Sequence, residues 1–168
     1  MLKNANGSVG QVIVLLFVFF LLACSSPCRQ WQLECVLCPC PEYNSGHLYL
    51  PAFGSENNLE LEFFRGSSGI NLYLNVASLP LPFAKENSDL VPIELMIEEN
   101  RTEYLVHRLQ GGQRALFTPE ATSAIINALF NGERVFIEAG RYHAEIVPTR
   151  FVEQYQRLMQ IPMIQIPQ

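Results

Sequence analysis

Lysine, aspartate and tryptophan are scarce in this chain of 168 residues, which contains two lysines, one aspartate (Asp89) and one tryptophan. The single aspartate excludes any mechanism that needs a pair of aspartates. Positive charge is also sparse, because eleven lysines and arginines face sixteen acids and no basic cluster interrupts this balance. An acidic chain without a basic patch is a poor partner for a polyanion. We therefore expect no nucleic-acid partner.

The chain also lacks an apolar run long enough to cross a bilayer as a helix. Its longest unbroken run, VIVLLFVFFLL, extends over eleven residues from Val12 to Leu22, whereas a spanning helix needs about 20. The run follows a polar N-terminal stretch with one positive charge, Lys3. This arrangement is typical of a secretory signal peptide, which we expect over residues 1–23.

The end of the run, Leu21-Leu22-Ala23-Cys24, resembles the lipobox of bacterial lipoproteins. The resemblance implies cleavage after Ala23 and acylation of Cys24, with the mature chain anchored to a membrane of the cell envelope through its lipid. Ser25 after the cysteine favours the outer membrane over the inner membrane in the sorting pattern of such lipoproteins. The alternatives are an ordinary signal peptide with a chance cysteine, and an uncleaved anchor.

The four remaining cysteines follow closely. Residues 24–46 contain three prolines and no apolar periodicity, and we expect them to form a tether outside the folded domain. An even number of thiols in an oxidising compartment predicts two intramolecular disulfides, whose pairing stays open. Intermolecular disulfides, a redox pair and a zinc site are the alternatives; a single CxxC, followed by Pro39-Cys40-Pro41, disfavours the last two. The candidate disulfide residues are Cys28, Cys35, Cys38 and Cys40.

From His47 onward the pattern changes, and residues 47–168 are expected to form a single domain. Apolar and polar residues alternate in several short segments bounded by turn residues, which is typical of antiparallel strands with one solvated face. Strands are predicted over residues 47–53, 59–64, 70–76, 92–99, 103–109, 113–118, 134–139 and 142–147. Tight turns are predicted at Asn100-Arg101 and at Gly111-Gly112, and residues 77–91 are predicted to form a loop.

Two helices are predicted beside these strands. The main helix begins at Pro119 after the N-cap Thr118, and it ends near Phe130 before Asn131-Gly132. A second, short helix is predicted over residues 149–159. The sequence therefore predicts an α+β domain, with an antiparallel sheet of about six to eight strands on which both helices pack.

Candidate catalytic groups are few. The histidines His47, His107 and His143 lie in alternating strands, where a histidine is usually solvent-facing or satisfied by a backbone partner. Of these, His107 and His143 are the weak catalytic candidates. A carboxylate cluster on one hairpin could supply a second group: Glu94, Glu98, Glu99 and Glu103. No phosphate loop, nucleophile elbow or metal-spaced histidine set is present, so we expect no cofactor and no metal.

Two functional hypotheses follow from these observations. In the first, the chain is a non-catalytic envelope module that binds another envelope protein or assembly through its sheet. The expected contact residues are aromatic: Phe53, Phe63, Phe64 and Tyr73. In the second, it is a small hydrolase or modifier of envelope material that uses His107 or His143 with a glutamate. The convergence of a histidine with a glutamate in a pocket would favour the second hypothesis.

Overall fold

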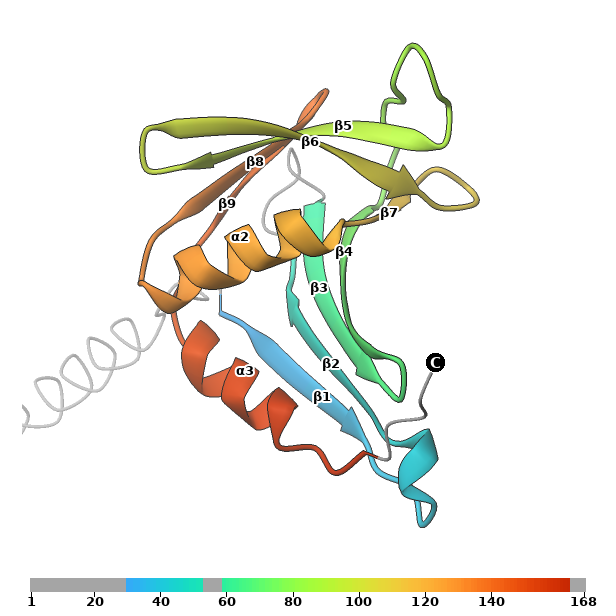
Figure 1. Cartoon of the computed structure of the whole chain (residues 1–168), viewed down its shortest axis with the longest axis vertical. Helices are drawn as coiled ribbons and strands as arrows, with labels where there is room; N and C mark the ends of the chain where they lie inside the picture. The colour runs from blue at the N-terminus through green and yellow to red at the C-terminus, as the bar shows by residue number, and fades with distance from the viewer. Residues whose placement is uncertain (1–29, 53–58, 164–168) are drawn as a thin grey trace, which may run out of the picture.

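The computed structural model describes residues 30–52 and 59–163, and these residues form an antiparallel sheet of nine strands with two α-helices and one short 3-10 helix (Figure 1). The strands are β1 Gln32–Val36, β2 Ser45–Leu50, β3 Leu59–Gly66, β4 Gly69–Val76, β5 Leu90–Ile97, β6 Asn100–Arg108, β7 Arg114–Leu116, β8 Val135–Ala139 and β9 Tyr142–Ile146. The helices are η1 Pro41–Tyr43, α2 Pro119–Phe130 and α3 Phe151–Met159. The predicted α+β fold with one main helix and a short C-terminal helix is confirmed.

The sheet is strongly curved, and its strand order is β1-β2-β3-β4-β7-β6-β5-β8-β9. In Figure 1 the strands surround α2 on three sides, and α3 lies beside β1, which agrees with its contacts to β1 and β2. The indole Nε1 of Trp31, just before β1, donates a hydrogen bond to the Val147 carbonyl oxygen, just after β9, at 2.9 Å. This bond joins the two ends of the sheet.

The alternation of residues along each strand sets an inner face, which is buried, and an outer face. In β2, Leu48 and Leu50 are fully buried, whereas His47 and Tyr49 lie on the outer face. The same period of two recurs along β3, β4, β5, β8 and β9. The helix α2 adds Ile125 to this core, because its buried residues fall on one stripe.

The predicted limits of α2 are confirmed by its end residues. The Thr118 hydroxyl oxygen accepts a hydrogen bond from the Ala121 backbone N–H at 3.3 Å. At the other end Gly132 has a φ of 80°, the left-handed conformation that favours glycine after a helix. The β5–β6 turn differs from its prediction, because Glu98 and Glu99 form it and Asn100 already belongs to β6.

The predicted tether is wrong from Trp31 onward, because the domain includes Trp31 and β1. Trp31 is only 2 % exposed and belongs to the core, and β1 pairs with β2 along its whole length. Too few residues of this edge strand face the core for a periodic pattern to be visible. Gly46 of β2 is also part of the packed domain, since a Cβ there would overlap Leu158 and Ile161. The predicted signal peptide, Cys24 and Cys28 lie outside the described residues.

Candidate functional site

The three histidines lie on the outer face of the sheet, in separate parts of it. His47 is in β2, His107 in β6 and His143 in β9, which are the second, sixth and ninth strands in sheet order. Each histidine alternates with buried neighbours such as Leu48, Val106 and Ala144, so the strand pattern turns it outward. The structure does not bring the histidines together, but it places each beside different polar groups.

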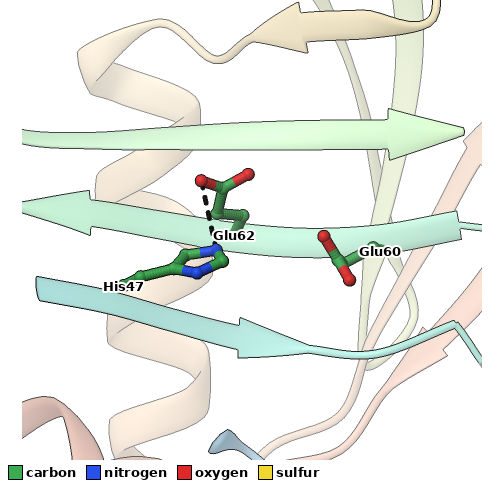
Figure 2. Close-up of side chains that lie close together, drawn as sticks. All are labelled: His47, Glu60 and Glu62. Atoms are coloured by element: carbon green, nitrogen blue, oxygen red, sulfur yellow. Dashed lines mark ion pairs between the residues drawn. The ribbon is translucent and has the colours of Figure 1, made fainter. Parts of the chain in front are cut away.

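His47 lies next to the acidic residues of β3 (Figure 2). Its Nε2 atom is 3.1 Å from Oε1 of Glu62. Glu60 and Glu62 share the outer face because they flank the buried Leu61. One ligand-type atom from each of His47, Glu60 and Glu62 lies within 4.8 Å of the other two. We call these three residues the β2–β3 cluster.

Glu62 is the most buried member of the β2–β3 cluster, at 8 % exposed. A buried carboxylate needs charge and hydrogen-bond partners to be stable. Arg114 of β7 supplies them, since its Nη2 lies 3.0 Å from both carboxylate oxygens. Asn75 of β4 donates to Oε2 at 2.7 Å, and the same amide donates to Glu60 at 3.2 Å. Side chains from β4 and β7 therefore fix the position of the Glu62 carboxylate.

The other side of the His47 ring faces β1. Its Nδ1 atom is 3.9 Å from Oε2 of Glu34, and its ring stacks on Tyr49 with 4.7 Å between centroids. The Tyr49 hydroxyl group lies 2.9 Å from Oε1 of Glu34 and 2.8 Å from Oε1 of Gln32. The hydrogen bond to Glu34 raises the pKa of Tyr49 above its ordinary value. The imidazole is thus held between carboxylates on two sides.

The sequence does not predict the β2–β3 cluster, because its members come from strands whose register is not visible in the sequence. The pairing of Glu34 with His47 needs β1, a strand that the cysteine-rich stretch conceals. The only local signal is the alternation Glu60-Leu61-Glu62, which places two carboxylates on one face of a strand.

A second polar site lies on the outer face over β5, β6, β8 and β9. It is an open hollow with a volume of about 370 Å³, which we call the outer hollow. Its apolar lining comes from Met96, Phe136 and Ile137, and Phe136 is 39 % exposed. Its polar lining consists of Glu94, Arg101, Glu138, His143 and Glu145.

The outer hollow brings together one predicted catalytic candidate and one member of the predicted glutamate cluster. Strand pairing sets Glu138 opposite both Glu94 and His143, so these three residues form a row across the sheet. Arg101 pairs with Glu94 at 2.5 Å, which offsets part of the repulsion between the carboxylates. Of the other predicted glutamates, Glu103 lies opposite Glu94 in β6, whereas Glu98 and Glu99 lie in the turn. The predicted glutamate cluster is therefore divided, and only Glu94 of it lines the outer hollow.

His107, the other catalytic candidate, lines a different depression of about 390 Å³ beside the start of α2. Its polar neighbours there include Asn71, Thr118 and Thr122, and no carboxylate lines this depression among the residues that the structure describes. The combination of His107 with a glutamate therefore has no support from this pocket.

The predicted aromatic contact surface is wrong at Phe63, whereas Phe64 and Tyr73 lie on the outer face as predicted. Phe63 is fully buried in the core, because its register places it on the inner face with Leu61. The Arg114 guanidinium lies 3.9 Å from the centre of the Tyr73 ring and covers it. Phe64 remains, at 37 % exposed, and Phe53 lies outside the described residues.

The cysteines of the described chain, Cys35, Cys38 and Cys40, are free thiols, and Cys35 and Cys40 are exposed. Every pairing of the four cysteines into two disulfides joins two of these three, and the structure contains no disulfide among them. Within residues 30–52 and 59–163, no helix has the length and apolar character needed to cross a membrane. Comparisons with protein-family models, curated proteins and solved structures find no match to this chain.

Proposed function

We propose that the chain is a lipid-anchored protein of the bacterial cell envelope whose domain is a non-catalytic module that binds a partner protein. The lipobox-like sequence Leu21-Leu22-Ala23-Cys24 supports the anchor. A chain held in this way needs no membrane-spanning segment, because its acyl groups supply the apolar contact with the bilayer.

The position of Trp31 supports a close attachment to the membrane. Trp31 is the first core residue in the described part of the chain, and six residues separate it from Cys24. At the reach of an extended chain, this stretch spans at most about 25 Å. Phe151 lies near the membrane in this arrangement, because its ring is 5.0 Å from that of Trp31.

The outer hollow is the observation that carries the binding role. Its apolar lining includes Met96 and Phe136, and its polar lining has three carboxylates, Glu94, Glu138 and Glu145, against one arginine, Arg101. Glu94 pairs with Arg101 and Glu145 pairs with Arg134, so the lining keeps an excess of acidic groups. An apolar recess with acidic groups around it complements a segment in which an apolar side chain stands beside lysine or arginine. The partner is therefore a protein segment of this kind.

A peptide array tests this role. Peptides with a central apolar residue flanked by lysine and arginine should bind the protein, and the same peptides with glutamate flanks should not. Phe136→Glu should abolish the binding, because it adds a charge to the apolar lining. Phe64→Glu is the matched control, since Phe64 has a similar exposure on another part of the sheet. Equal binding of both peptide sets, or equal loss in both variants, would refute the proposal.

A hydrolase of envelope material is the second candidate, and one observation favours it. His143 and Glu138 are direct cross-strand partners, and both line the outer hollow. An imidazole and a carboxylate in one recess can share acid–base work. Release of soluble fragments from purified envelope material, lost in both His143→Ala and Glu138→Gln, would support this candidate over the binding module.

A further inference from the structure

We propose that the β2–β3 cluster is a binding site for one Zn²⁺ ion, with His47 Nε2 and carboxylate oxygens of Glu60 and Glu62 as its ligands. Imidazole nitrogen and carboxylate oxygen are ligands that zinc takes at about 2.0–2.2 Å. Such a set leaves a fourth position for water. The site lies on another part of the sheet from the outer hollow, so the proposal does not depend on the proposed function.

The spacing of the ligand atoms fits one shared ion. Two atoms bound to one tetrahedral zinc at these lengths lie about 3.3 Å apart. The Nε2 atom of His47 and Oε1 of Glu62 are 3.1 Å apart, and the whole set lies within 4.8 Å. Glu60 lies farther along β3 (Figure 2), and its ligand oxygen is the one that must move closer for all three residues to bind one ion.

The His47 Nε2 atom gives an independent indication. This atom is buried and has no hydrogen-bond partner, although Oε1 of Glu62 is only 3.1 Å away. The oxygen therefore lies off the axis of the ring nitrogen, which is unfavourable for a hydrogen bond. When a histidine nitrogen and a carboxylate oxygen bind the same metal ion, the ion lies along the lone-pair direction of the nitrogen. The carboxylate oxygen then lies to one side of that direction.

The surroundings suit a cation and a fixed imidazole. Glu34 lies 3.9 Å from the opposite ring nitrogen, which is too far for a hydrogen bond but adds negative charge beside the imidazole. Arg114 and Asn75 hold Glu62 in place, and each oxygen of a carboxylate can accept more than one partner. The acids Glu34, Glu60 and Glu62 outnumber the single arginine, which leaves negative charge for a divalent cation.

The experiment must separate this site from the free thiols, because thiolates also bind zinc. The untagged full-length chain is purified in detergent, and its thiols are blocked with iodoacetamide. Zn²⁺ binding is then measured by calorimetry, and Co²⁺ serves as a spectroscopic substitute. The variants are His47→Ala and Glu60→Gln, with His143→Ala as the matched control, and circular dichroism verifies that each is folded.

We expect one equivalent of Zn²⁺ in the thiol-blocked wild type, and visible Co²⁺ bands without the near-ultraviolet band of a sulfur ligand. His47→Ala and Glu60→Gln should each weaken binding by about tenfold or more, and His143→Ala should leave it unchanged. Absence of binding after thiol blocking would overturn the proposal. Unchanged affinity in both cluster variants would overturn it as well.

Discussion

At the scale of single residues, Trp31 shows that the folded domain extends further toward the N-terminus than the sequence predicts. It lies in a stretch whose cysteines and prolines predict a tether, yet its ring packs against Phe151 at 5.0 Å and Phe63 at 5.7 Å. Its Nε1 also donates a hydrogen bond to the Val147 carbonyl oxygen. One aromatic residue thus connects the chain before β1 to the far edge of the sheet and to α3.

Trp31→Ala should therefore destabilise the domain strongly. Removal of a large buried aromatic side chain lowers the free energy of unfolding by about 3–5 kcal/mol. The measurement is denaturant unfolding followed by circular dichroism, since the variant has no tryptophan fluorescence. Leu37→Ala is the control, because Leu37 is 65 % exposed and a surface change of this kind has an effect of about 0.5 kcal/mol or less. Equal stability of the two variants would place Trp31 outside the core.

Tyr155 gives a prediction about pH. Burial raises the pKa of Tyr155 above its ordinary value of 10.0. The unfolded chain therefore loses this proton at lower pH than the folded chain does, so that stability falls as the pH rises through and above about 10. Tyr155→Phe should reduce this fall, measured as the unfolding free energy between neutral and alkaline pH. An identical decline in both proteins would show that Tyr155 does not contribute.

At the scale of elements, the sequence correctly predicts the features that depend on residues close together in the chain. The cap residues Thr118 and Gly132 place the ends of α2 correctly, because a helix end depends on groups within a few residues. The alternation of apolar and polar residues likewise predicts β2 to β9. It does not predict β1, since Gln32–Val36 is an edge strand with few core-facing residues.

The pairing of the strands cannot be predicted in the same way, and the candidate sites depend on it. β7 lies between β4 and β6, and this placement brings Arg114 to Glu62. The β2–β3 cluster and the outer hollow each combine several strands, so their residues become neighbours only through long-range register. His143 was recognisable as a candidate, whereas its row with Glu94 and Glu138 was not.

Gly132→Val tests the end of α2. The residue has a φ of 80°, and a Cβ there would meet no atom within 4 Å. The loss therefore comes from the backbone conformation alone, and we expect about 1 kcal/mol or more in thermal or denaturant unfolding. Gly132→Asn should lose less, because asparagine tolerates the left-handed conformation. If the two variants are equally stable, the C-cap does not govern this helix end.

At the scale of the whole molecule, the proposal is a compact domain held against a membrane by a short lipid-bearing segment. Cys24→Ala should abolish lipid labelling of the protein, because it removes the thiol that the acyl group needs. The unfolding free energy of the domain should not change, since the described core residues all lie at Trp31 or beyond. Normal lipid labelling of the variant would contradict acylation at Cys24.

The mass of the N-terminal peptide, from protein recovered from the membrane of a bacterial host, tests directly whether Cys24 carries the lipid anchor. We expect a peptide that begins at Cys24 and carries a diacylglyceryl group on its sulfur atom. A peptide that begins at Met1 with an unmodified Cys24 would contradict the account.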